Sequence, residues 1–175
     1  MQNQHLFMEK MSLEGQVKTS ANWFYWIAGF SIINSLVLWF QGSWSFVVGL
    51  GITQFIDYFG QSFSAEYGNN VFTILAFVVD LLIAGLFVLF GVLANKRYKA
   101  SFIIGMILYG LDGLIFIFIK DYLSLAFHAY ALYAIYRGFK AINRLTFVEQ
   151  AIAAPMSQEY REAEEGHTEI GDGNS

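Results

Sequence analysis

Four ionisable side chains and one amide interrupt long apolar stretches of this chain: Asp57, Asp80, Asp112, His128 and Asn34. A charged group facing lipid is costly, so such residues are expected to face neighbouring helices, where they can pair. Burial raises the pKa of a carboxyl group and lowers that of an imidazole, unless the two form a pair. These residue types could therefore bind and release a proton, or hold a cation.

Asp112 and His128 belong to one predicted helical hairpin over residues 101–138, in which two apolar runs flank the short break Lys120-Asp121-Tyr122. Both residues are equally distant in sequence from Lys120. In an antiparallel hairpin that turns at Lys120, they lie at the same depth on neighbouring helices. We therefore expect Asp112 and His128 to lie close together inside the bundle.

The remaining candidates fall near the same level. At a rise of about 1.5 Å per residue, Asn34, Asp80, Asp112 and His128 lie about 9–13 Å from the outer ends of their helices. The sequence thus predicts one buried polar layer. Asp57 is expected on a separate outer helix, at the mouth of that layer.

The elements that carry these residues are predicted from composition and hydropathy. Of the 175 residues, 56% are hydrophobic and only 14% are charged, whereas about 25% are charged in soluble domains. Such a chain is expected to be a membrane protein whose apolar surface faces the lipid bilayer. The absence of cysteine excludes disulfides and thiolate chemistry, and no basic cluster suits nucleic acid.

The predicted fold is an all-α polytopic transmembrane bundle with four spans and an interfacial or re-entrant helix. A short true span in place of that helix is the alternative, which would make five spans. Apolar runs of about 20 residues define each span. The expected segments are a surface segment 1–20, a bundle over 21–154 with spans about 23–40, 71–94, 101–119 and 123–140 and the interfacial helix about 44–59, and a disordered acidic tail 155–175 that follows a helix end at Pro155.

The distribution of Lys and Arg predicts the orientation. Basic residues lie before the first span, in the loop between the spans 71–94 and 101–119, and at the end of the last span. Because basic residues favour the cytoplasmic side, both termini are expected in the cytoplasm. This indicates a multi-pass cell-membrane protein with the general appearance of small bacterial inner-membrane proteins. The basic residues are Lys10, Lys18, Lys96, Arg97, Lys99, Arg137, Lys140 and Arg144.

Three functions remain open on these grounds, and the sequence carries no motif of a named family. A transporter or proton- or ion-binding protein predicts a water-accessible cavity reaching Asp112. An accessory or scaffold subunit predicts a dry, fully hydrogen-bonded layer and a homo-oligomeric or membrane partner. A His/Asp or metal-dependent enzyme predicts a metal or water between Asp112 and His128, although no metal-binding spacing such as HExxH is present. Metal and cofactor identity stay undetermined.

Overall fold

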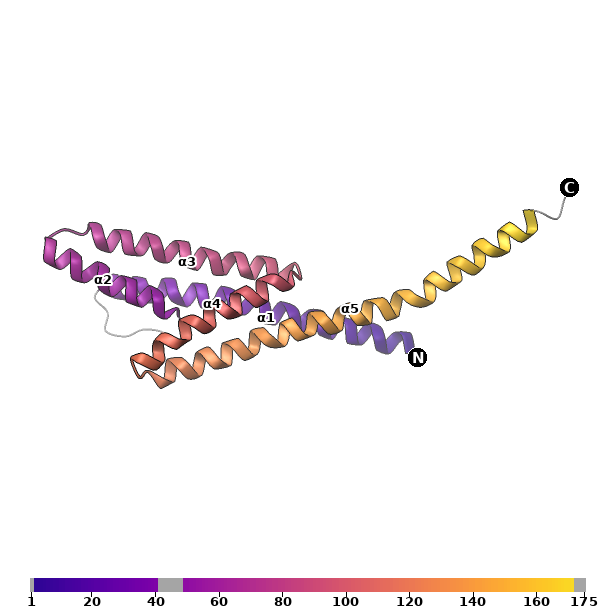
Figure 1. The fold of residues 1–175 in the computed structure, drawn as a ribbon, viewed down its shortest axis with the longest axis horizontal. Coiled ribbons are helices and arrows are strands. Elements are labelled where there is room, and N and C mark those ends of the chain that lie inside the picture. Colours follow the sequence, from indigo (N-terminus) through magenta and orange to yellow (C-terminus); the bar gives the residue numbers. More distant parts are fainter. Residues whose placement is uncertain (1, 41–48, 172–175) are drawn as a thin grey trace.

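The structure, a computed structural model, describes the backbone of residues 2–40 and 49–171 and the side chains of residues 4–40 and 49–154. These segments are helical and contain no strand, which confirms the predicted all-α class. The helices are α1 (Gln2–Trp39), α2 (Gly51–Tyr67), α3 (Val71–Asn95), α4 (Lys99–Phe118) and α5 (Tyr122–Gly171). Helix α1 packs against α3 and α5, α4 packs against α5, and the shorter α2 packs against α3 (Figure 1).

In helix α2 and in residues 71–86 of α3, small and polar residues face inward and most large apolar residues face outward. The buried residues of α2 include Thr53, Asp57 and Ser64, whereas Phe55 and Tyr58 are exposed. Helix α3 buries a stripe of small residues and one carboxyl group: Ala76, Asp80, Ala84 and Gly91. This inverted distribution is typical of helices that pack closely together within lipid.

An aromatic cluster fills the centre of the bundle. Phe24 of α1 contacts Phe87 and Phe90 of α3 and Phe102 of α4, with ring centroids 6.0–6.4 Å apart. Tyr109 of α4 extends the cluster by an edge contact with Phe87. These rings bury a large apolar area and fix α1, α3 and α4 against one another.

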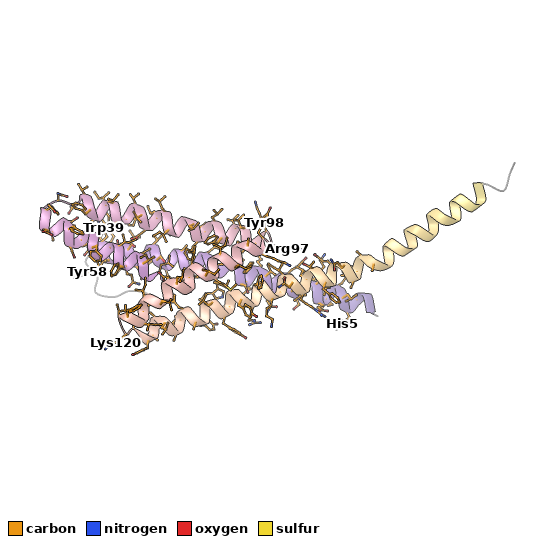
Figure 2. All side chains as sticks on the ribbon, in the orientation of Figure 1. His5, Trp39, Tyr58, Arg97, Tyr98 and Lys120 are labelled. Carbon is orange, nitrogen blue, oxygen red and sulfur yellow. The ribbon has the colours of Figure 1, made fainter. Side chains whose placement is uncertain are left out.

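Charged residues gather at the end of the bundle where α3 turns into α4. Arg97 donates hydrogen bonds to Glu14 of α1 at 2.6 Å and to Glu149 of α5 at 2.9 Å. Figure 2 shows Arg97 and Tyr98 at this end, and Trp39 and Lys120 at the other. The ion pairs join the extensions of α1 and α5 beyond the α3–α4 turn.

Three helices in the described residues are long and apolar enough to cross a membrane: Gln4–Trp39, Val71–Asn95 and Lys99–Phe118. They indicate a membrane location. The expected span over 123–140, in the first part of α5, is not among them. Tyr130, Tyr133, Tyr136 and Arg137 reduce its hydropathy.

The structure differs from the sequence-based boundaries at α1 and α2. Residues 2–20 continue without a break into the first predicted span as one helix. Helix α2 begins at Gly51 and runs on to Tyr67, beyond the predicted end at 59, and part of the predicted helix, 44–48, lies outside the described residues. Gly68 then ends α2 in the left-handed conformation, with φ of 65°.

The predicted helix end at Pro155 differs from the structure, in which α5 continues to Gly171. The disorder of the acidic tail stays a prediction. Residues 156–171 contain five Glu and one each of Gln, Ala and Arg, all good helix formers. That local propensity outweighs the interruption that one proline causes.

Candidate functional site

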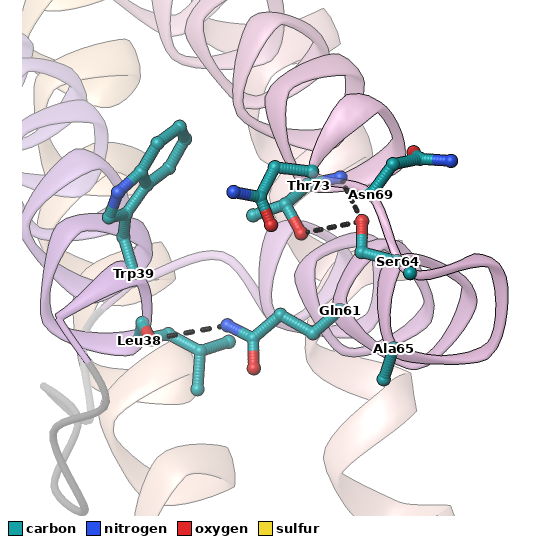
Figure 3. Close-up of a pocket in the computed structure, with 9 residues that line it drawn as sticks. Leu38, Trp39, Gln61, Ser64, Ala65, Asn69 and Thr73 are labelled. Carbon is teal, nitrogen blue, oxygen red and sulfur yellow. Dashed lines mark hydrogen bonds between the residues drawn. The ribbon is translucent and has the colours of Figure 1, made fainter.

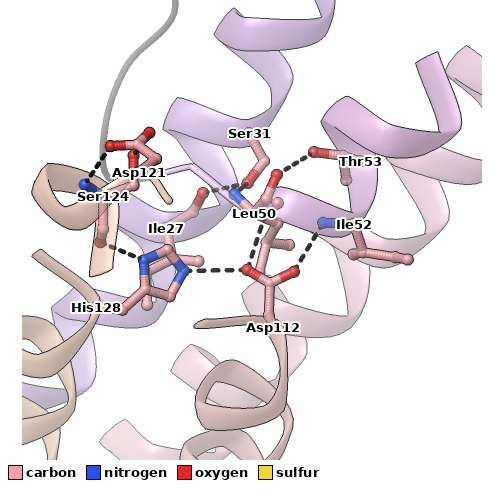
Figure 4. Close-up of polar contacts among 10 residues, drawn as sticks. Ile27, Ser31, Leu50, Ile52, Thr53, Asp112, Asp121, Ser124 and His128 are labelled. Carbon is pink, nitrogen blue, oxygen red and sulfur yellow. Dashed lines mark hydrogen bonds and ion pairs between the residues drawn. The ribbon is translucent and has the colours of Figure 1, made fainter. Parts of the chain in front are cut away.

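The carboxyl group of Asp112 lies at the N-terminus of α2. Its Oδ2 accepts a hydrogen bond from the backbone N–H of Gly51, and its Oδ1 accepts one from that of Ile52, both at 2.8 Å (Figure 4). The first N–H groups of a helix have no partner within the helix, and the N-terminus carries a partial positive charge. Asp112, from α4, therefore satisfies and neutralises the buried start of α2.

His128 completes this centre from α5. Its Nε2 lies 3.0 Å from Asp112 Oδ2, and its Nδ1 lies 2.8 Å from the carbonyl oxygen of Ser124. Because a carbonyl only accepts, Nδ1 is the donor in its bond to Ser124. The imidazole stacks on Tyr109, with ring centroids 4.2 Å apart. The predicted proximity of Asp112 and His128 is confirmed.

Helix α1 also contacts the start of α2. Leu50 donates its backbone N–H to Ser31 Oγ at 2.8 Å, and Ser31 donates to the carbonyl of Ile27. At Gly51 the backbone approaches Phe116 so closely that an added Cβ would lie 2.8 Å from the ring. Two helices, α1 and α4, thus hold the start of α2 by hydrogen bonds, and His128 of α5 supports Asp112 from behind. The absence of a side chain at Gly51 permits the close approach.

A second buried polar centre lies between α1, α2 and α3. Asp80 of α3 is 1% exposed and Asp57 of α2 is 5% exposed. Ser35 of α1 donates a hydrogen bond to Asp80 Oδ2 at 2.7 Å. The carboxyl groups of Asp57 and Asp80 lie close enough to interact electrostatically.

The second centre, unlike the first, is incomplete. Asp57 Oδ2 and Asp80 Oδ1 are buried and find no hydrogen-bond partner in the part of the chain that the structure describes. Ionised carboxylates only accept hydrogen bonds, so two of them in contact cannot satisfy each other. The sequence offers no compensating cation on these spans, since it has no Lys or Arg between Lys18 and Lys96.

The expected single layer is therefore two separate centres. Asp112 and His128 meet at the start of α2, whereas Asp80 meets Asp57 about 9 Å further along that helix at a rise of 1.5 Å per residue. Asp57 is buried beside Asp80 rather than exposed at a mouth, so that part of the prediction is wrong. Asn34 is buried and lies beside Gly49, where an added Cβ would meet its amide.

Comparison with protein-family models, curated proteins and solved structures found no match to this chain.

Two hollows lie on the helices that carry these centres. A hollow of about 350 Å³ touches Asp112, but its other lining residues are apolar and include Leu50, Phe87 and Leu108. A second, of about 520 Å³, lies between the ends of α1, α2 and α3, and polar residues such as Gln61, Ser64 and Thr73 line it (Figure 3). The polar hollow lies on the three helices that hold Asp57 and Asp80.

Several contributors were not assigned roles from the sequence. Ser35 is the direct donor to Asp80, although a serine within an apolar span carries no distinctive signal of that role. Tyr109 stacks on His128 from within an apolar run, with no local signal of that role. The donors at Gly51 and Ile52 are backbone N–H groups, which an analysis of side-chain types does not predict. Within the described residues, no three His, Asp or Glu side chains gather where they could share a metal ion.

Proposed function

We propose that this chain is a small multi-pass membrane protein that binds a proton at the Asp57–Asp80 pair. The observation that supports the proposal is the pair of buried, unpartnered oxygens, Asp57 Oδ2 and Asp80 Oδ1. Two adjacent carboxylates without a nearby cation are strongly unfavourable in a medium of low dielectric constant. A proton shared between them supplies the missing donor and removes one charge.

A proton fits this centre better than a divalent metal ion. Calcium takes six to eight oxygen ligands and magnesium takes six. Around the pair, the described side chains offer the two carboxyl groups and the hydroxyl of Ser35. A proton needs only one donor bond and one acceptor, which two carboxyl oxygens provide.

The proposed arrangement in the membrane has four spans, with α2 as a re-entrant helix. The first part of α5 packs against α1 and α4 and carries the partner of Asp112, which supports a fourth span. Leu50, at the start of α2, is 1% exposed and lies between α1 and α4, whereas Tyr67 at its end is 62% exposed. The distribution of basic residues supports a cytoplasmic location of the α3–α4 turn and of both termini.

Infrared spectroscopy of the protein in lipid films tests the proposal. A protonated carboxyl group has a C=O stretching band that a carboxylate lacks, and titration follows its loss. We expect such a band at neutral pH in the wild-type protein. Asp80→Asn and Asp57→Asn should each alter or remove it, whereas Asp121→Asn, at the exposed α4–α5 turn, should leave it unchanged.

Two results would contradict the proposal. One is a wild-type spectrum without a protonated carboxyl band at neutral pH. The other is a band that Asp80→Asn and Asp57→Asn both leave intact. A band that appears only when sodium or potassium is withdrawn would assign the pair to a monovalent cation instead of a proton.

A scaffold or accessory subunit is the second candidate function, and the Asp112–His128 centre favours it. Every polar atom of the Asp112 carboxyl group has a partner there, and the contacts join α2, α4 and α5. Polar contacts of this kind fix the arrangement of helices in membrane bundles. The direct contact between Asp112 and His128 leaves no space for the bridging metal or water that the enzyme hypothesis expects.

A further inference from the structure

The polar pocket at the α2–α3 end shares its helices with the Asp57–Asp80 pair. Leu38 and Trp39 from α1, Gln61 and Ser64 from α2, and Thr73 from α3 line a hollow of about 520 Å³. The same helices hold Ser35, Asp57 and Asp80. Each of the three helices therefore contributes residues both to the pocket and to the acid pair.

The two features are close along each helix. Gln61 is one helical turn from Asp57, and Leu38 is about one turn from Ser35. Thr73 is two turns from Asp80, which corresponds to about 10 Å of rise. The pocket therefore lies directly beyond the acid pair, toward the end of the bundle formed by the α2–α3 turn.

The pocket lining suits water better than lipid. Thr73 donates its backbone N–H and its hydroxyl to Ser64 Oγ, at 3.0 and 2.9 Å, and these groups face the hollow beside two asparagines. Figure 3 shows these side chains around the opening. The hollow beside Asp112 has an apolar lining, so the two cavities offer different environments.

Along α2, Gln61 lies between Asp57 and the pocket residue Ser64, and it lines the pocket itself. Its side chain extends from α2 to α1 and donates a hydrogen bond from Nε2 to the carbonyl of Leu38 at 3.1 Å (Figure 3). On the side toward α3, the close contact of Gly60 with Ala76 fills the space, since a Cβ at Gly60 would lie 2.7 Å from that of Ala76. The Gln61 amide is thus the polar group at the floor of the pocket.

We infer that this pocket is the water-filled entrance through which protons reach Asp57 and Asp80, with Gln61 closing its floor. The inference rests on the proposed proton-binding function and adds the route and the membrane face. Protons would enter from the side opposite Arg97, because the pocket lies at the other end of α3. In this step an O–H bond of hydronium breaks and an O–H bond to a carboxylate oxygen forms, which leaves a neutral water molecule in the pocket.

Single-cysteine labelling tests the route, because the natural chain has no cysteine. Ala65→Cys places a thiol in the pocket lining. Glu66→Cys places one at the same depth on an exposed position that does not line it. Each variant is labelled in lipid vesicles with a bulky, membrane-impermeant methanethiosulfonate, and infrared spectroscopy then follows hydrogen–deuterium exchange of the protonated carboxyl band.

We expect the label at Ala65→Cys to slow exchange severalfold and the label at Glu66→Cys to leave it unchanged. Gln61→Ala should accelerate exchange, because it removes the side chain between water and the pair. Equal exchange rates in the two labelled variants, with the band present, would overturn the entrance while leaving the proton-binding function intact. A missing band in the unlabelled protein would instead contradict proton binding itself.

Discussion

Two buried carboxyl centres lie about 9 Å apart along α2, and they differ in how completely their polar atoms are satisfied. At Asp112, two backbone N–H groups and an imidazole surround the carboxyl group. At Asp57 and Asp80, two oxygens find no partner in the described residues. The carboxyl groups of both centres are buried, so burial alone does not distinguish the two centres.

The difference separates a structural role from a binding role. A complete network rigidifies the helices that it joins and gains nothing from a further ligand. An incomplete one carries a desolvation cost that a ligand can remove. The same residue type, aspartate, therefore supports the fold at one end of α2 and a candidate proton site further along it.

The largest expected effect comes from removing the complete centre. Asp112→Ala leaves the N–H groups of Gly51 and Ile52 and the His128 ring without their acceptor, so we expect a loss of about 3–5 kcal/mol. Thermal unfolding in lipid nanodiscs, followed by circular dichroism, measures it. The neighbouring variant Leu111→Ala, at a position 58% exposed, serves as the control. Equal losses in the two variants would refute the structural role.

Gly51→Ala tests the close approach at the start of α2. Its new Cβ would lie 2.8 Å from Phe116, so Phe116 and the helices must shift, at an expected cost of about 1–3 kcal/mol. Gly85→Ala is the matched control, because a Cβ there meets nothing within 4 Å. The same unfolding measurement should show no loss for Gly85→Ala. A tolerated Gly51→Ala would mean that α2 is held less tightly than described.

A smaller effect is expected at the α4–α5 turn, outside both centres. Asp121 accepts the backbone N–H of Ser124 at 3.1 Å and also its hydroxyl at 2.5 Å, so it caps α5. Asp121→Ala should cost about 0.5–2 kcal/mol, the range for a lost N-terminal cap. This loss should be smaller than that of Asp112→Ala.

The cap also has a defined pH dependence. Hydrogen bonds from Ser124 hold the pKa of Asp121 below its ordinary value of 3.8. The cap therefore contributes fully above pH 3.8 and loses its contribution as pH falls through the folded pKa. Asp121→Asn should flatten this part of the acid stability curve. An unchanged curve would show that Asp121 does not cap α5 in the membrane.

The smallest effect on stability is expected at the incomplete centre. Asp80→Asn replaces a carboxyl group by an amide that can donate to Asp57, so the unpartnered oxygens gain a donor. We expect thermal stability to remain unchanged or to rise, in contrast to Asp112→Ala. A marked loss on Asp80→Asn would place both centres in the same structural class.

The pairing of Asp112 with His128 could be predicted because a short turn at Lys120 leaves little freedom. Two antiparallel helices joined by so few residues have a determined register, so equal distances from the turn give equal depth. The small-residue stripe of α3 was predictable for a similar reason, since it depends only on helical periodicity.

The partner of Asp80 could not be predicted in the same way. The depth of α2 depends on the backbone hydrogen bonds to Asp112 and Ser31, which hydropathy and residue spacing do not reveal. The sequence therefore placed Asp57 at the mouth of the layer instead of beside Asp80. The helical continuation beyond Pro155 was missed because the proline was taken as the end of the helix, although the residues that follow it favour a helix.

Solid-state NMR with ¹³C-labelled aspartate in lipid tests the central contrast most directly, because the side-chain carboxyl shift reports the protonation state of each assigned residue. At neutral pH, at least one of Asp57 and Asp80 should carry a proton, and Asp80→Asn should remove or shift that signal. Asp112 should show a hydrogen-bonded carboxyl group whose signal Asp80→Asn leaves unchanged. Ionised carboxylates at both Asp57 and Asp80 would contradict the account.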